Sequence, residues 1–211
     1  MILLLKARIL VFLSLKLDKI TEVRWHGVGG LKTLHLLQSE SHELKQIVES
    51  CLPDIVFLQI GGNDIKIDSD PCAIATDIQN VTEALVKLKV RRVIVGAVMP
   101  RFEPTAEASA GMCRWRGRKP PRFRSASEIH TYVEKYNDCA RMVNEILSSR
   151  FKGRSDVIFW RHNSQFTFRN DAERERIRSR FGDDGVHHSM QGMYHFAKSI
   201  RGALIATLSL L

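Results

Sequence analysis

The chain of 211 residues is long enough to bury a hydrophobic core without disulfide or metal staples. Its apolar fraction of 44% and charged fraction of 26% exclude a disordered or low-complexity chain. The formal net charge of +9 indicates either a solvated basic surface or attraction to nucleic acid or an anionic membrane.

The cysteines and the N-terminal residues indicate the compartment. No C-x-x-C pair occurs, so we expect free thiols rather than a disulfide framework or a zinc site at Cys51, Cys72, Cys113 and Cys139. The apolar start MILLLKARILVFLSLKL is interrupted by Lys6 and Arg8, and no small-residue cleavage site follows it. It is too short and too charged for a membrane span. We therefore expect a cytoplasmic or nuclear protein.

Strands and helices are expected to alternate along the chain. The patterns predict strands at 1–5, 23–25, 55–60, 91–99 and 156–160. They predict helices at 9–17, 41–51, 74–88, 125–150 and about 189–208, with Ser125 and Glu128 as a capping box. The apolar end of the last helix, ALIATLSLL, is interpreted as core. A long irregular stretch is expected at 101–124, and the charge pattern of RNDAERERIRSRF predicts a surface helix.

This alternation predicts one domain over 1–211 with a doubly wound α/β fold. We expect a three-layer α/β/α sandwich with a mainly parallel, flavodoxin-like sheet. The apolar run of residues 55–60 fits a strand covered on both faces. In such folds ligands bind beyond the carboxyl ends of the strands.

Two of the predicted strand ends are rich in glycine. GGND (61–64) combines a sharp backbone turn with the neutral amide donor of Asn63, which suits a developing oxyanion. An ordinary Asx turn is the alternative interpretation. HGVGG (26–30) offers backbone N–H groups to the same edge of the sheet, or is only a tight turn.

The stretch DDGVHHS (183–189) places Asp184 three residues before His187, with Gly185 between them. An aspartate that accepts from the imidazole Nδ1–H leaves Nε2 to act as a general base. The alternatives are surface polar residues or a metal site, but the latter lacks further convergent ligands.

The blocks GGND and DGVH, about 120 residues apart, resemble those of the SGNH (GDSL-type) hydrolase superfamily. The stretches VRWHGVGGLKT, DIVFLQIGGNDI and DGVHHSMQGMYHFA are similar to esterase-type domains of animal non-LTR retrotransposons. The resemblance implies acyl ester hydrolysis by a Ser-His-Asp mechanism without cofactor or metal. It implies an oxyanion hole at Gly30 and Asn63, supported by Gly61, and a triad with Asp184 as acid and His187 as base.

The block that carries the family's nucleophilic serine is not found. If residues 1–5 are the first strand, Lys6-Ala7-Arg8 occupies the turn that should hold it. An alternative alignment ends the strand at Phe12 and makes Ser14 the candidate nucleophile, within a cramped loop. Otherwise the chain is a degenerate copy, or its N-terminal part is incomplete.

The segment CRWRGRKPPRFRS (113–125), which overlaps the expected 101–124 basic loop insertion, contains six basic residues between Arg114 and Arg124 and no acid. Basic and aromatic side chains together suit phosphates and unstacked bases. The candidate contact residues are Arg114, Trp115, Arg116, Arg118, Lys119, Arg122 and Arg124. The alternative function is therefore a catalytically inactive module that binds single-stranded nucleic acid or anionic lipid. A solvated insertion beside the active-site face is the other interpretation of this segment.

Overall fold

A computed structural model describes residues 2–6, 22–38, 43–113, 123, 125–168 and 170–209. Its centre is a parallel sheet of five strands in the order β2-β1-β3-β4-β5. The strands are β1 (Ile2–Lys6), β2 (Val23–Gly27), β3 (Ile55–Gln59), β4 (Arg92–Gly96) and β5 (Val157–Trp160). This is the flavodoxin-like order, so the predicted sheet is confirmed.

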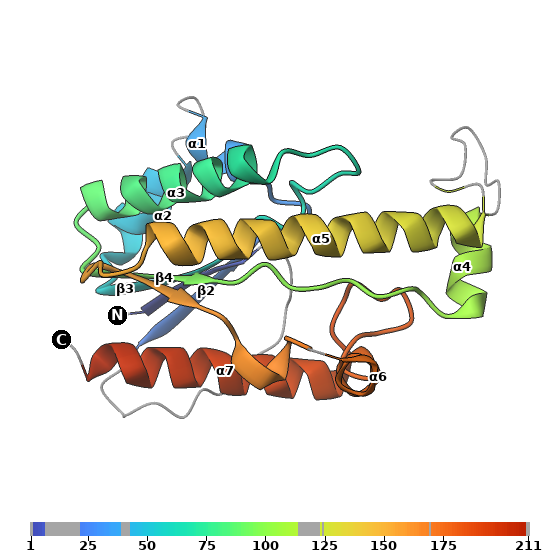
Figure 1. Ribbon diagram of the computed structural model, residues 1–211. Helices are drawn as coiled ribbons and strands as arrows, with labels where there is room; N and C mark the ends of the chain where they lie inside the picture. The colour runs from blue at the N-terminus through green and yellow to red at the C-terminus, as the bar shows by residue number, and fades with distance from the viewer. Residues whose placement is uncertain are drawn as a thin grey trace.

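Helices cover both faces of the sheet and complete three layers (Figure 1). One face carries α1 (Thr33–Leu37), α2 (Glu43–Cys51), α3 (Pro71–Lys87) and α5 (Ala126–Arg150). The other carries α6 (Asp171–Arg178) and α7 (Met190–Leu208). A short helix, α4 (Ala106–Cys113), lies beyond the sheet, next to the start of α5 (Figure 1).

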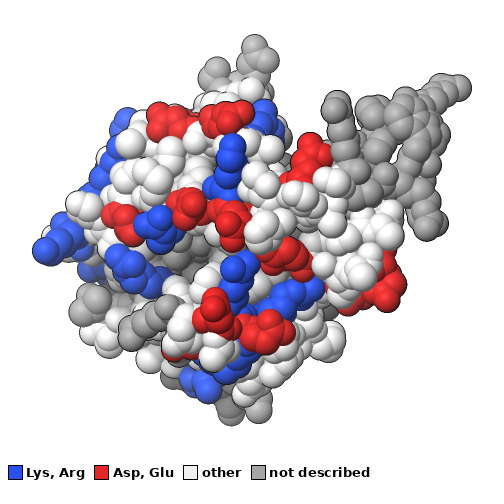
Figure 2. All heavy atoms as spheres, turned by 45° about the vertical axis from the view of Figure 1, so that its right-hand side comes forward, with Lys and Arg blue, Asp and Glu red and all other residues white. Residues whose placement is uncertain are grey.

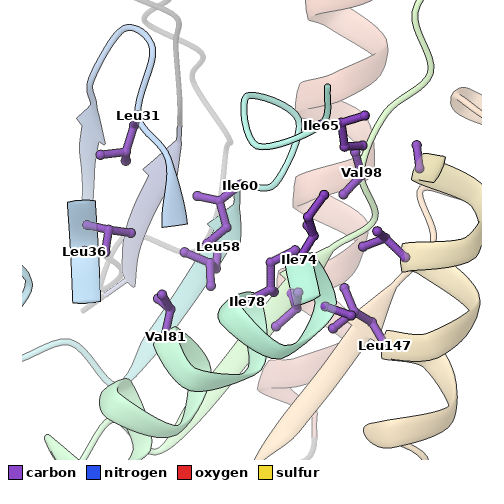
Figure 3. Packing of buried hydrophobic residues seen from close by; sticks show 14 of the residues in the cluster. Leu31, Leu36, Leu58, Ile60, Ile65, Ile74, Ile78, Val81, Val98 and Leu147 are labelled. Carbon is purple, nitrogen blue, oxygen red and sulfur yellow. The ribbon is translucent and has the colours of Figure 1, made fainter. Parts of the chain in front are cut away.

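The central strand β3 contributes to two cores. Val56 and Leu58 pack with the cluster under α3 and α5, whereas Ile55 and Phe57 pack with the cluster under α7. Side chains alternate between the two faces of a strand, so a strand covered on both faces is apolar at every position. In Figure 3, α3 lays its buried face over the end of β3, with α5 alongside; the labelled residues there include Leu58, Ile60, Ile74, Ile78 and Leu147.

Most of the predicted helices begin and end where the sequence indicates. Ser125 caps α5 as expected, because its hydroxyl accepts the Glu128 N–H at 3.2 Å. Ser189 caps α7 in the same way through the Gly192 N–H, also at 3.2 Å. The predicted surface helix is α6, and the interior face of α7 is buried at Ala203 and Leu204.

Among the described residues, two short α-helices and the 3₁₀ helix η1 (Asn163–Gln165) were not predicted. The interpretation of 101–124 as irregular was wrong for Ala106–Cys113, which forms α4. The Thr105 hydroxyl accepts the Ala108 N–H at 3.3 Å, and the alanines that follow have high helix propensity. The other missed α-helix is α1. The helix predicted at 9–17 lies outside the described residues.

The expectations about the cysteines and about membrane spans can be compared with the structure. Cys51, Cys72 and Cys139 are free thiols, as expected, and the Cys113 side chain is outside the described part. Within the described residues, every helix is too short or too polar to cross a membrane.

Candidate active site

A cavity of about 390 Å³ opens at the carboxyl ends of β3 and β4. Its walls come from the loops that follow β2, β3 and β4, from α5 and from the loop between α6 and α7. The four residues proposed from the sequence, Gly30, Asn63, Asp184 and His187, all line this cavity. Elements far apart in the chain therefore meet where a doubly wound sheet is expected to bind ligands.

Asp184 and His187 form a hydrogen-bonded pair on the cavity wall. The Asp184 Oδ2 contacts the His187 Nδ1, while its Oδ1 accepts the backbone N–H groups of Val186 and His187, both at 2.9 Å. In an imidazole that donates from Nδ1 to a carboxylate, Nε2 is the atom that can act as a general base. The geometry is that of a histidine oriented by a carboxylate.

The loop that carries this pair is fixed against the segment that follows β4. The Phe102 N–H donates to the Gly185 carbonyl at 2.9 Å, and the Thr105 N–H donates to the Asp183 carbonyl at 2.8 Å. Gly185 has φ +68, and a Cβ there would lie 2.0 Å from the Phe102 carbonyl oxygen. Only glycine fits this turn, which explains its place between the acid and the base.

The charge state of Asp184 follows from its surroundings. Partial burial tends to raise its pKa, but the hydrogen bonds from the His187 and Val186 backbone and from the His187 ring outweigh burial and lower it. The carboxylate is therefore ionised at neutral pH. It can hold one imidazole tautomer and stabilise the imidazolium form.

Asn63 links the two glycine-rich loops. Its Nδ2 donates to the Leu31 carbonyl at 3.0 Å, and Leu31 directly follows Gly30. An amide NH₂ group has two hydrogens, so one remains for a ligand in the cavity. Gly61 has φ +98, and a Cβ there would lie 2.8 Å from Ile78 Cδ1. Gly61 thus lets the strand turn sharply over α3.

Asp64 ties the same two loops together, a role that the sequence reasoning missed. Its Oδ1 accepts the Thr33 hydroxyl at 2.9 Å and the Thr33 N–H at 3.2 Å. Burial raises the pKa of Asp64, and the hydrogen bonds from Thr33 only partly oppose that effect. Asn63 and Asp64 together therefore fasten the loop that contains Gly30.

Two asparagines of α5 hold the segment after β4 in an extended conformation. Asn144 exchanges hydrogen bonds with both backbone groups of Val98, at 2.8 and 2.9 Å. Asn137 does the same for Arg101, at 2.8 Å for each bond. The seven-residue spacing places both amides on one helix face, a signal that was present in the sequence.

Arg101 lines the cavity, and the sequence reasoning missed it as well. Its Nη2 donates to the Gly62 carbonyl at 2.9 Å, its Nη1 contacts the Tyr132 hydroxyl, and its guanidinium lies 4.1 Å from the centre of the Tyr136 ring. Burial raises the pKa of Tyr136 to about 12, more than the nearby Arg101 lowers it. Tyr136 is thus neutral at physiological pH, while Arg101 is a cation.

A buried polar chain supports Gln59, which also lines the cavity. Gln59 Nε2 donates to the Ala97 carbonyl at 2.9 Å, and its Oε1 lies 2.9 Å from His162 Nε2. His162 Nδ1 lies 3.0 Å from the Ser199 hydroxyl, which accepts the Trp160 indole N–H at 2.9 Å. These bonds make His162 a satisfied core histidine that fixes the Gln59 amide.

The nucleophile predicted from the family is not among the described residues of the cavity wall. The strand that pairs with β2 and β3 is Ile2–Lys6, so a strand near 1–5 is confirmed, but Lys6 is its last residue and not part of the turn. Ala7 and Arg8 lie outside the described residues. Ser14 and the alternative alignment lie outside the described residues. No described residue that lines the cavity is a serine, threonine or cysteine.

The structure leaves the basic segment largely untested. All seven candidate contact residues of 114–124 lie outside the described part, although the flanking Met112 and Phe123 are placed. Met112 lines the cavity, and Phe123 packs 5.4 Å from the Tyr132 ring. On the face shown in Figure 2, basic and acidic side chains are interspersed.

Within the described residues, no group of three or more His, Cys, Asp or Glu could hold a metal ion.

Comparison with known proteins identifies the fold. No family model matches the sequence, and no curated protein matches it. Among solved structures, a Streptococcus pneumoniae protein provisionally described as a platelet activating factor has a TM-score of 0.65 at 17% identity, covering 96% of this chain and 83% of its own. A Slackia heliotrinireducens protein provisionally described as an SGNH hydrolase has a TM-score of 0.59 at 16% identity, covering 96% and 97%.

A carbohydrate acetylesterase from Sinorhizobium meliloti has a TM-score of 0.58 at 14% identity, covering 97% of this chain and 98% of its own. Each similarity extends over most of both chains. Because the sequence identities are low, these solved structures share only the fold with this chain. The chain has the α/β/α fold of SGNH hydrolase structures, as the sequence predicted.

Proposed function

We propose that this chain is an SGNH-type hydrolase of acyl esters. One observation carries the proposal: the hydrogen-bonded pair of Asp184 and His187 lines the same cavity as Asn63 and Gly30. A general base and neutral N–H donors that line one cavity are two of the parts that ester hydrolysis uses, and the third is the attacking hydroxyl group.

In this proposal His187 Nε2 takes a proton from the attacking hydroxyl group. The hydroxyl oxygen bonds to the ester carbonyl carbon, and the carbonyl electron pair moves onto the oxygen. That oxyanion accepts hydrogen bonds from the Asn63 amide and the Gly30 backbone N–H. The intermediate collapses as the C–O bond to the alcohol breaks, and the leaving alkoxide takes the proton from His187.

The attacking group is either a serine or a water molecule. Ser14 is the candidate serine, and with it the acyl group passes to the enzyme before water releases the acid. With water alone, the oxyanion hole and binding leave roughly 10³–10⁴-fold acceleration over water, as measured for a different serine hydrolase. The chain is then a weak esterase with a degenerate site.

The origin of the chain is a further part of the proposal. Its sequence blocks VRWHGVGGLKT, DIVFLQIGGNDI and DGVHHSMQGMYHFA support descent from the esterase domains of animal non-LTR retrotransposons. Such descent would fit a cytoplasmic or nuclear location and a decayed nucleophile block.

The first test is hydrolysis of 4-nitrophenyl acetate by the purified chain, His187→Ala and His130→Ala. His130 is the matched control, because it binds Glu103 on the surface at 2.9 Å and does not line the cavity. We expect His187→Ala alone to abolish the activity. Equal rates in all three proteins would refute a role for His187. Ser14→Ala then separates the serine route from the water route.

The second candidate function is binding of single-stranded nucleic acid by an inactive hydrolase fold. The charge of +9 and the six basic residues of 114–124 favour it. Fluorescence anisotropy with a labelled oligonucleotide should then show affinity that falls steeply with salt. Binding that is absent, or unchanged when the arginines of 114–124 become glutamine, would exclude this function. Binding to anionic vesicles alone would point to lipid instead.

A further inference from the structure

We propose that Arg101 makes the cavity select esters that carry a second, negatively charged group, a carboxylate or a phosphate. The inference rests on the proposed function, because it names the substrate class of the same site. Its evidence is separate, since it concerns a cation that the hydrolytic steps do not use.

The guanidinium of Arg101 is held in place from three sides. Asn137 binds both backbone groups of Arg101 at 2.8 Å. The Arg101 Nη2 donates to the Gly62 carbonyl at 2.9 Å, and its Cζ lies over the Tyr136 ring, 4.1 Å from the ring centre. Nη1 also contacts the Tyr132 hydroxyl. An arginine fixed in this way loses little further side-chain entropy when it binds an anion.

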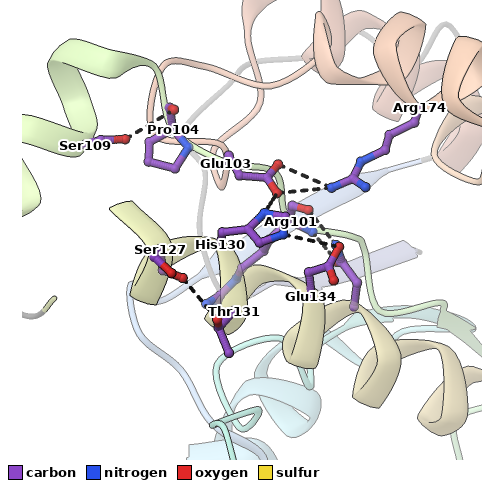
Figure 4. A network of polar contacts seen from close by, with 10 residues as sticks. Arg101, Glu103, Pro104, Ser109, Ser127, His130, Thr131, Glu134 and Arg174 are labelled. Atoms are coloured by element: carbon purple, nitrogen blue, oxygen red, sulfur yellow. Dashed lines mark hydrogen bonds and ion pairs between the residues drawn. The ribbon is translucent and has the colours of Figure 1, made fainter. Parts of the chain in front are cut away.

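The positive charge of Arg101 has no acidic partner within 4.0 Å in the described part of the chain. The nearest acid in the sequence, Glu103, is bound instead by His130 at 2.9 Å and by Arg174 at 3.3 Å (Figure 4). The acid that shares the cavity wall, Asp184, is paired with His187. The cavity therefore contains an arginine whose charge the described residues leave uncompensated.

Arg101 also retains hydrogen-bonding capacity. A guanidinium has five N–H groups, and its two side-chain contacts use one each on Nη1 and Nη2. The remaining donors suit the paired oxygens of a carboxylate or phosphate. Apolar neighbours on the wall, including Ile60, Val98 and Met99, lower the local dielectric and strengthen such a contact.

A purely structural role is the competing explanation. By holding the Gly62 carbonyl, Arg101 also steadies the loop that ends in Asn63. A brace of this kind would affect charged and neutral esters equally. Selectivity between matched ligands, rather than activity, therefore separates the two explanations.

The test measures binding in the His187→Ala background by calorimetry, so that turnover does not interfere. The probes are monomethyl succinate (a carboxylate), methyl phosphonoacetate (a phosphonate) and neutral methyl butyrate. We expect at least one anionic probe to bind about tenfold or more tightly than methyl butyrate, as one charge-assisted contact provides. Which anion binds more tightly distinguishes carboxylate from phosphate esters.

Substitutions then assign the preference to Arg101. We expect Arg101→Met to remove it and Arg101→Lys to retain part of it, while the exposed Arg141→Met serves as the control. If the His187→Ala protein, which retains Arg101, binds anionic and neutral probes with equal affinity, the proposal is overturned, whether or not the Arg101 variants fold. Equal weakening of all probes by Arg101→Lys would leave only the structural role. Charge preference without hydrolysis would refute the proposed function but not the anion site.

Discussion

The loop after β3 (61–64) and the loop between α6 and α7 (182–188) face the same cavity, and each contains a hydrogen-bonded aspartate. Asp184 receives two backbone N–H groups and the His187 ring, and its pKa is lowered despite partial burial. Asp64 receives the backbone N–H and hydroxyl of one residue, Thr33, and burial raises its pKa. The balance between hydrogen-bond donors and burial thus shifts the pKa values of the two carboxyl groups in opposite directions.

This difference suggests a division of roles between the two loops. A carboxylate with a lowered pKa is suited to orient and stabilise a charged imidazole. A carboxylate with a raised pKa is costly to ionise, and its contacts with Thr33 point to a structural function. Substitutions at both loops can sharpen the comparison or refute it.

The largest effect is expected for Asp184→Asn compared with Asp64→Asn. Asparagine at 184 can donate to Nδ1 and favour the wrong imidazole tautomer, so we expect esterase activity to fall by about 10³- to 10⁴-fold. Asparagine at 64 keeps an oxygen that accepts from Thr33, so we expect a loss below about tenfold. The rates of 4-nitrophenyl acetate hydrolysis provide the measurement. Similar losses in both variants would remove the distinction between the loops.

A smaller effect is expected on stability when the glycines of the two loops become alanine. In Gly185→Ala the added Cβ would lie 2.0 Å from a backbone oxygen at φ +68, so we expect a loss of about 3 kcal/mol or more. In Gly61→Ala it would meet the mobile end of Ile78 at 2.8 Å, so we expect about 2 kcal/mol.

Chemical denaturation followed by circular dichroism gives these free energies of unfolding. Gly30→Ala is the control, because it has φ +74 but nothing within 4 Å of the added Cβ. We expect it to lose only about 1 kcal/mol, the cost of the backbone conformation. A loss at Gly185 no greater than that at Gly30 would show that the contact with Phe102 does not constrain the loop.

The smallest effect is expected in the pH dependence of stability. The folded-state pKa of Asp184 is lowered, so its contribution is present above the unfolded value near 3.8 and is lost as the pH falls. The folded-state pKa of Asp64 is raised, so its ionisation has a cost that is absent at acidic pH and develops as the pH rises above 3.8.

The difference in free energy of unfolding between the unmodified protein and Asp184→Asn should therefore increase as the pH rises. The same difference for Asp64→Asn should decrease. Thermal unfolding of the protein and both asparagine variants, at several pH values between acid and neutral, measures the direction of each change. Two differences that change in the same direction would contradict the opposite shifts.

The sequence was sufficient where one pattern dominates. Continuous apolar runs such as Ile55 to Ile60 predict strands covered on both faces, and caps such as Ser125 set helix starts within a residue. The gathering of Asn63, Asp184 and His187 around one cavity could be expected from strand ends of a parallel sheet. Their roles in catalysis stay a prediction.

Other features depend on partners far away in the sequence. Arg101 lies in an extended segment with no motif, and its position follows from Asn137, 36 residues later. Asp64 looked like part of a turn, because its partner Thr33 is 31 residues earlier. Such contacts arise only when the chain folds, so local patterns and propensities do not indicate them.

The polar chain beneath Gln59 has an optical consequence. The Gln59 side chain donates to Ala97, so its oxygen accepts from His162 Nε2, and His162 Nδ1 then accepts from Ser199, whose oxygen receives the Trp160 indole N–H. Every bond in this chain thus runs in one direction, from the indole to the cavity wall. A ligand that turns the Gln59 amide would have to change the His162 tautomer and reverse the bonds on either side of that ring, while the indole N–H remains a donor. We therefore expect the fluorescence of Trp160 to change when a ligand turns the Gln59 amide.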